Sequence, residues 1–151
     1  MTNTTNQDPF DLNRFISAQD KVYDRVLLQL KHGCKRSHWM WYIFPQLDGL
    51  AQSTTSKYYA IKSPSEAVAY LNHPVLGRRL RECANMIVAI EGKTVSEIFG
   101  YPDDLKLFSS MTLFSEVAAE PIFIRVLDKY FQGERDDRTL QLLKKLKNTS
   151  N

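Results

Sequence analysis

The sequence contains few cysteines, and their positions exclude most thiol chemistry. Cys34 and Cys83 are the only two among 151 residues, and their spacing matches no metal-binding or redox motif. Isolated thiols of this kind are typical of proteins from a reducing compartment. The polar segment 1–11 also lacks the basic and apolar regions of a signal peptide. We therefore expect a cytoplasmic protein.

Long apolar runs, metal ligands and activated nucleophiles are also missing. The longest apolar run, 39–44, is far shorter than the roughly 20 residues of a membrane-spanning helix, so no membrane partner is expected. None of the three histidines, His32, His38 and His73, has a carboxylate at the helical spacing of zinc motifs. No Gly-x-Ser-x-Gly motif occurs. We therefore expect neither a metal nor a cofactor.

A strong excess of charge of one sign is absent too. The formal net charge is +3, with 25% charged and 43% hydrophobic residues, which is ordinary for a globular protein. Basic residues gather in two short clusters, within 31–36 and 78–81, and each could hold a pyrophosphate or a nucleic-acid backbone. Because such clusters are usually solvated surface, we do not expect nucleic acid as the partner.

What the sequence does contain is helical periodicity. Apolar residues recur at the three- and four-residue spacing of an amphipathic helix, and no segment alternates as a strand does. Capping signals mark several helix starts, above all Ser63 before Pro64 and the capping box from Thr94 to Glu97. The predicted helices cover about 11–31, 37–44, 63–72, 74–91, 94–99, 101–114, 121–132 and the chain from 137 onward.

These signals predict an all-α protein. We expect one compact domain over 11–147, built from about six to eight short and medium helices in an irregular topology. The polar segments 1–10 and 148–151 are expected to be frayed. Segment 46–56 has no periodicity and is predicted to be a loop, a kind of segment that often carries function.

The densest chemistry lies in segment 35–46. It holds both tryptophans, Trp39 and Trp41, beside two cations and a histidine. Indole rings bury large areas yet keep one N–H that needs a partner, so they suit a pocket wall as well as a core. Because alternate residues of a short helix face different ways, we expect one indole in the core and the other in a cleft.

The motif Ser-His-Trp-Met-Trp-Tyr-Ile-Phe-Pro-Gln at 37–46 also carries a family resemblance. The chain resembles the bacterial and fungal family filed as domain of unknown function 1810, often mislabelled calpastatin. Ala51 stands where that family usually has the second glycine of Gly-Leu-Gly. The other resembling stretches include 59–61, 69–77, 98–100 and 102–114, so that the resemblance covers roughly 11–146.

The resemblance implies a compact, mostly helical and monomeric protein with a cleft at the Trp-rich motif. By fold analogy alone, it also links the chain to helical NADAR-type proteins, which are thought to act on ADP-ribose or related N-glycosides. We therefore expect the cleft to bind a nucleotide-like or ADP-ribose-type small molecule.

The residues expected to bind that molecule supply stacking surface, positive charge or hydrogen bonds. The indoles would stack, the cations would hold an anionic part, and the hydroxyls and the amide would fix polar groups. On a helix, residue 106 shares a face with 109 and 110. The expected binding residues are Lys35, Arg36, Trp39, Trp41, Tyr42, Gln46, Ser53, Lys106, Ser109 and Ser110.

If the protein is a hydrolase, His38, Asp103 and Asp104 are its expected catalytic residues. The like charges of Lys35 and Arg36 favour a neutral His38 ring, which can accept a proton. Acids at a helix start usually cap it, but one of the two aspartates could instead face a sugar and assist hydrolysis of an N-glycosidic bond.

Two other functions fit the same residues. A non-catalytic protein-interaction or ligand-binding module would place the Trp-rich motif in a flat apolar patch or an inert pocket. A weak nucleic-acid binder would need both basic clusters on one face of the molecule.

Overall fold

The computed structural model of the protein describes residues 7–149, and this part of the chain forms ten α-helices and no strand. The predicted all-α class is confirmed, with ten helices rather than six to eight. No helix within 7–149 is both long enough and apolar enough to cross a membrane. The helices are α1 (Asn13–Asp20), α2 (Tyr23–Lys31), α3 (Met40–Ile43), α4 (Thr54–Tyr59), α5 (Pro64–Asn72), α6 (Leu76–Ala89), α7 (Val95–Phe99), α8 (Asp103–Ala118), α9 (Pro121–Phe131) and α10 (Asp137–Thr149).

The two extra helices arise where the sequence predicted one long helix and one loop. The predicted helix 11–31 is interrupted at Val22, whose φ of −131° is not helical, so that α1 and α2 form separately. At the end of the predicted loop, Ser53 caps α4 by accepting a hydrogen bond from the N–H of Ser56 at 3.1 Å. Such short helices depend on tertiary packing, which local periodicity does not report.

The first residue of the predicted helix 11–31 does not cap α1. Asp11 adopts a left-handed backbone with φ of +53°, and its side chain makes no capping hydrogen bond. Instead, the carboxylate of Asp8 accepts hydrogen bonds from the N–H groups of Leu12 at 2.7 Å and Asn13 at 2.9 Å. An acid a few residues upstream therefore satisfies the N–H groups that a helix start leaves unpaired.

Parts of both segments that were predicted to be frayed lie within the described chain. Within residues 7–10, Phe10 packs against the hydrophobic core. At the other end, α10 continues to residue 149, into the predicted frayed tail. The rest of both predicted tails, 1–6 and 150–151, lies outside the described residues.

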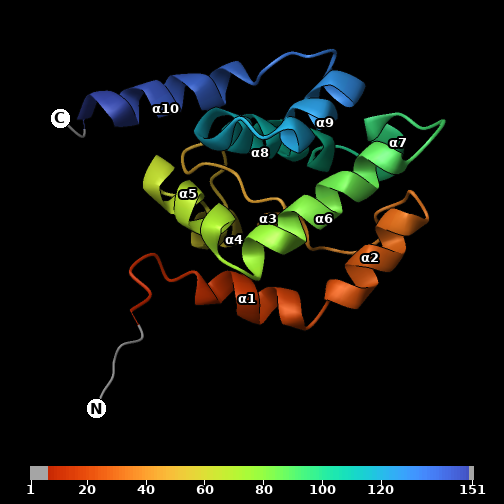
Figure 1. The fold of residues 1–151 in the computed structure, drawn as a ribbon, viewed down its shortest axis with the longest axis horizontal. Helices are drawn as coiled ribbons and strands as arrows, with labels where there is room; N and C mark the ends of the chain where they lie inside the picture. Colours follow the sequence, from red (N-terminus) through yellow and green to blue (C-terminus); the bar gives the residue numbers. More distant parts are fainter. Residues whose placement is uncertain (1–6, 150–151) are drawn as a thin grey trace.

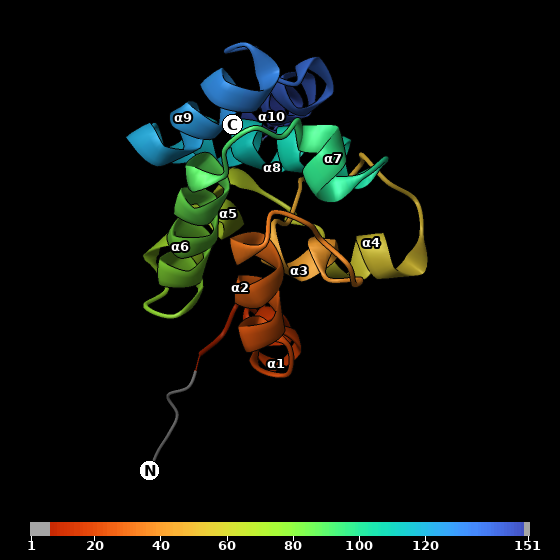
Figure 2. The same cartoon turned by 90° about the vertical axis from the view of Figure 1, so that its right-hand side faces the viewer.

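Helix α8 lies at the centre of the fold. It contacts α5, α7, α9 and α10, with α9 and α10 above it and α1 to α4 below it (Figures 1 and 2). Leu107 and all residues of 109–115 are buried, so the middle of α8 is enclosed on every side, as expected of a central helix. Its first turns and its last residues, 116–118, remain near the surface.

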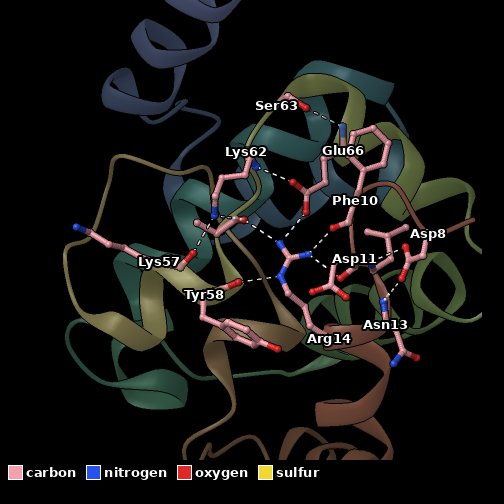
Figure 3. Close-up of polar contacts among 12 residues, drawn as sticks. Asp8, Phe10, Asp11, Asn13, Arg14, Lys57, Tyr58, Lys62, Ser63 and Glu66 are labelled. Carbon is pink, nitrogen blue, oxygen red and sulfur yellow. Dashed lines mark hydrogen bonds and ion pairs between the residues drawn. The ribbon is translucent and has the colours of Figure 1, made fainter.

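A buried ion pair joins α1 to α5 (Figure 3). Arg14 Nη2 lies 2.7 Å from Glu66 Oε2, and the two side chains are 6% and 2% exposed. Glu66 Oε1 accepts a further hydrogen bond from the N–H of Lys62 at 2.8 Å. All five guanidinium donors are used, because the other N–H groups donate to the carbonyls of Phe10, Asp11, Tyr58 and Ala60.

Arg81 makes a second clamp, between α6 and α9. Its Nε and Nη2 atoms each lie 2.7 Å from a carboxylate oxygen of Glu120, and Nη1 donates to the carbonyl of Leu71 at 3.2 Å. Hydrogen bonding from Arg81 holds the pKa of the Glu120 carboxyl below its usual range. A bidentate pair of this kind fixes geometry as well as charge.

We predict that Arg14→Met will destabilise the protein by about 3–5 kcal/mol, because it leaves the Glu66 carboxylate buried and unpaired. Urea unfolding measures the change. Arg125→Met, at an exposed position on α9, is the matched control and should shift the unfolding free energy by less than about 0.5 kcal/mol. Equal effects of the two variants would show that the buried pair has no special role.

We predict that Glu120→Gln will lower the unfolding free energy by about 0.5–1 kcal/mol at neutral pH, because the pair with Arg81 is partly exposed. Since folding lowers the pKa of Glu120, its contribution is complete above the ordinary carboxyl pKa and is lost as the pH falls through the folded-state pKa. Unfolding of both proteins between neutral and strongly acidic pH should therefore show the difference disappearing in acid. Glu134→Gln, at an exposed site, should show no such trend.

Candidate functional site

A groove with a volume of about 470 Å³ lies at the first turns of α8. One wall comes from the loop after α3, a second from the turn before α8 and its first two turns, and a third from the start of α10. We call it the Lys106 groove. Its lining residues are Gln46, Leu50, Ala51, Tyr101, Pro102, Leu105, Lys106, Phe108, Ser109, Asp136 and Arg138.

A small recess adjoins this groove, and the two share Gln46 and Lys106 as walls. We call it the Trp41 recess. Its remaining walls come from α3, α4 and the residue after α4, namely Trp41, Ser56, Tyr59 and Ala60. The loop after Pro45 and the start of α8 therefore meet beside an indole ring.

The electrostatics of the site depend on one carboxylate that two lysines share. Asp103 Oδ2 lies 2.7 Å from Lys35 Nζ, and Oδ1 lies 3.9 Å from Lys106 Nζ. The side chain of Lys35 is only 6% exposed, so Asp103 is committed chiefly to Lys35. Lys106 is left with a loose ion pair and with the face of Trp41, whose ring centroid is 5.2 Å from Nζ. The groove therefore carries a surplus of positive charge.

The third wall is fixed by hydrogen bonds between α8 and the chain entering α10. The hydroxyl of Ser109 lies 2.9 Å from Asp136 Oδ2, which also accepts a hydrogen bond from Thr139. The N–H of Asp136 donates to the hydroxyl of Thr112 at 2.9 Å. Ser109 thus lines the groove, as expected, but its hydroxyl already holds Asp136 in place.

The two tryptophans have different environments. Trp39 is 1% exposed, and its Nε1–H donates to Gln29 Oε1 at 2.8 Å. The same oxygen accepts the N–H of Arg36 at 2.8 Å, so Gln29 organises the loop that precedes α3. Trp41 borders the recess, and its buried Nε1–H has no hydrogen-bond partner within the described chain. Trp39 is therefore a core residue and Trp41 the indole at the candidate site.

Several expected binding residues lie away from the groove. The side chain of Arg36 is exposed and borders no described pocket. Ser53 serves as the cap of α4. Tyr42 packs against Tyr59 with the two rings tilted and their centroids 5.2 Å apart, and burial raises the pKa of its hydroxyl. Ser110 is fully buried because α8 turns it towards the core, and its hydroxyl has no hydrogen-bond partner among residues 7–149.

The expected catalytic residues also do not line the groove. The carboxylate of Asp104 accepts a hydrogen bond from the N–H of Leu105 at 2.8 Å, at the start of α8. Asp103 is paired with Lys35, as described above. His38 is exposed, and its backbone carbonyl accepts a hydrogen bond from the hydroxyl of Tyr42 at 3.4 Å. The only carboxylate among the lining residues belongs to Asp136.

Sequence reasoning missed several groove residues. Tyr101 and Leu105 are unusual among large apolar side chains because they are 81% and 50% exposed, and both line the groove. The helical spacing from Leu105 to Ser109 could have identified this face of α8. Asp136 and Arg138 gave no local signal, because they reach the groove only through the packing of α10 on α8.

A second hollow, with a volume of about 560 Å³, lies over Arg14 and Glu66. The guanidinium of Arg14 and the carboxylate of Glu66 in this hollow are fully hydrogen-bonded to the protein (Figure 3), although Lys57 and Lys62 also line it. Among residues 7–149, no group of three or more His, Cys, Asp or Glu side chains is placed to hold a metal ion. The Lys106 groove is therefore the better candidate site.

A comparison with family models shows the family of the chain. Residues 9–143 match the family model described as "Protein of unknown function (DUF1810)". A crystal structure of the conserved hypothetical protein Rv1873 from Mycobacterium tuberculosis is 51% identical and covers 91% of this chain and 99% of its own, with a TM-score of 0.90. No curated protein matches the chain.

We predict that Asp103→Asn will destabilise the protein by about 1–3 kcal/mol, since it leaves the nearly buried ammonium of Lys35 without a charged partner. The adjacent Asp104→Asn is the matched control and should cost less than about 1 kcal/mol, because it removes only a charge at the start of α8. Urea unfolding of both variants tests the difference. A larger loss from Asp104→Asn would contradict the assigned role of Asp103.

Proposed function

The chain belongs to the DUF1810 family of proteins of unknown function, and we propose that its Lys106 groove binds a small, planar, anionic molecule of the nucleotide type. The observation that carries the proposal is the sharing of Asp103 by two lysines. Lys35 takes the short contact of 2.7 Å, whereas Lys106 remains 3.9 Å away at the groove wall. A cation that lacks a close partner and borders a concave site favours an anionic ligand.

The walls of the groove suit a planar body. Tyr101 and Leu105 expose apolar surface at the site, and Phe108 is stacked on Phe131 with ring centroids 4.6 Å apart, which holds its ring in place. Aromatic and apolar surface around a few polar groups is the usual composition of a ligand pocket. A heterocyclic base is the kind of ligand body that stacks on such a surface.

Polar groups opposite Lys106 match the rest of a nucleotide. Arg138 brings a second cation to the groove, and a guanidinium recognises phosphate well. The carboxylate of Asp136 can accept hydrogen bonds from sugar hydroxyls, because the groups of Ser109 and Thr139 occupy only its Oδ2 atom. An ADP-ribose-type ligand fits this description.

We propose binding without a hydrolytic step. Asp103 and Asp104 are engaged with Lys35 and with the start of α8, and the exposed His38 does not line the groove. A general acid or base needs to reach the reacting atoms, and none of these three side chains borders the space that the ligand would occupy.

A nucleic-acid binder is less well supported, because several basic side chains are already paired. Lys35 pairs with Asp103, Arg79 with Asp20, and Arg81 with Glu120, at 2.7–2.9 Å. Paired cations contribute little to the phosphate contacts that give nucleic-acid binding its strength. Neither basic cluster therefore offers a continuous charged surface.

We predict that a nucleotide or ADP-ribose at a hundred times its dissociation constant will stabilise the folded protein by about 2.7 kcal/mol. Thermal unfolding against nucleoside mono-, di- and triphosphates, NAD⁺ and ADP-ribose measures the effect. Lys106→Met should weaken binding about tenfold or more by removing a charge-assisted contact. Lys144→Met, at an exposed position on α10 outside the groove, is the matched control and should bind as the wild type does. Unchanged melting with the whole panel would overturn the proposal.

A further inference from the structure

The Trp41 recess is too small for a whole ligand and large enough for one atom. Its volume of about 10 Å³ corresponds to the space that a single water molecule requires. The recess opens beside the Lys106 groove, with which it shares two residues, Gln46 and Lys106. A molecule lying in the groove can therefore place one protruding atom there.

The side chains around the recess supply hydrogen-bond donors and no carboxylate. The Nε1–H of Trp41 can only donate, and it is buried without a partner among the described residues. The ammonium of Lys106 can also only donate. The hydroxyl of Ser56 accepts a hydrogen bond from Ser53 at 2.8 Å, which leaves its own proton to donate.

The two other polar walls can donate as well. The carboxamide of Gln46 and the hydroxyl of Tyr59 make no hydrogen bond to the protein within residues 7–149. Burial raises the pKa of Tyr59, so its hydroxyl keeps its proton at neutral pH.

Backbone acceptors near the recess are already engaged. The carbonyl of Ala60 accepts hydrogen bonds from Arg14 Nη2 at 3.0 Å and from Lys62 Nζ at 3.3 Å. The carbonyl of Gln46 accepts the N–H of Ile61 at 2.9 Å. The side-chain oxygens at the recess can also accept a hydrogen bond, but the Nε1–H of Trp41 and the ammonium of Lys106 can only donate. An N–H group entering the recess would therefore leave the buried indole N–H of Trp41 unpaired.

We infer that the Trp41 recess binds one proton-free acceptor atom of the ligand, a carbonyl oxygen on a planar ring that lies in the Lys106 groove. This inference rests on the proposed function, which it deepens by naming the class of base. A carbonyl oxygen offers two lone pairs, so it can accept from Trp41 and Lys106 together. An exocyclic amino group would instead point its own N–H groups at these donors, and no hydrogen bond could form between them.

The inference predicts that the protein prefers keto bases to amino bases. Inosine and adenosine 5′-monophosphates form a suitable pair of probes, because they share ribose and phosphate while hypoxanthine has a carbonyl oxygen where adenine has an amino group. Leaving a buried donor unpaired is costly, so calorimetry should show inosine monophosphate binding about tenfold or more tightly.

Two variants assign that preference to the recess. Trp41→Phe keeps an aromatic ring but removes the N–H, and it should reduce the preference to less than about threefold. Tyr58→Phe is the matched control: Tyr58 neighbours Tyr59 but is exposed and borders neither the groove nor the recess. It should keep the wild-type preference.

The two indole N–H signals in ¹H–¹⁵N spectra give a readout that does not depend on affinity. The signal of Trp41, identified by its loss in Trp41→Phe, should move downfield with inosine monophosphate. The signal of Trp39, already bonded to Gln29, should stay in place. Equal binding of both nucleotides with an unmoved Trp41 signal would overturn the recess inference and leave the proposed function standing. Binding of neither nucleotide, nor of any other in the thermal panel, would overturn both.

Discussion

The buried guanidinium of Arg14 is the contact on which the arrangement of the site depends. It holds the carbonyls of Tyr58 and Ala60 at 2.8 and 3.0 Å while pairing with Glu66, so it fixes the backbone on both sides of Tyr59. Tyr59 and Ala60 are walls of the Trp41 recess. Because every N–H of the group is used, the chain after α4 has one favourable position, and moving it would leave a buried charge unpaired. An ion pair on one side of this segment thus shapes the recess on the other.

The same rigidity extends to the groove through a short backbone pairing. The N–H of Ile61 donates to the carbonyl of Gln46 at 2.9 Å, and the N–H of Asp48 donates to the carbonyl of Ile61 at 2.8 Å. Gln46, which borders both spaces, is therefore anchored to the segment that Arg14 holds. Opposite it, the first turn of α8 is anchored through Asp103 and Lys35. A site whose walls are anchored by contacts outside the groove needs little reorganisation when a ligand binds, and this favours affinity.

The sequence predicted what short-range chemistry controls. The capping box of Thr94 and Glu97 forms as predicted, with both of its hydrogen bonds, and Ser63 caps α5, because those partners are only three residues apart. The cap supplied by Asp8 and the break at Val22 were missed, since each depends on how the chain packs. In the candidate site, the sequence singled out Gln46 and Lys106, which both line the groove. Asp136 and Arg138 could not be, because α10 reaches the groove only in the folded protein.

The two tryptophans differ in whether the indole N–H has a hydrogen-bond partner within the protein, and this difference distinguishes the core residue from the site residue. Each indole has a lysine over its ring, Lys35 at 5.0 Å from Trp39 and Lys106 at 5.2 Å from Trp41, and both lysines face Asp103. Trp39 gives its N–H to Gln29, and Lys35 takes the short contact with the carboxylate, so that pair is satisfied within the protein. Among the described residues, the buried N–H of Trp41 has no partner, and Lys106 has only a loose ion pair with Asp103, at the edge of a groove. Buried donors without partners are costly, and a ligand that accepts from both removes that cost.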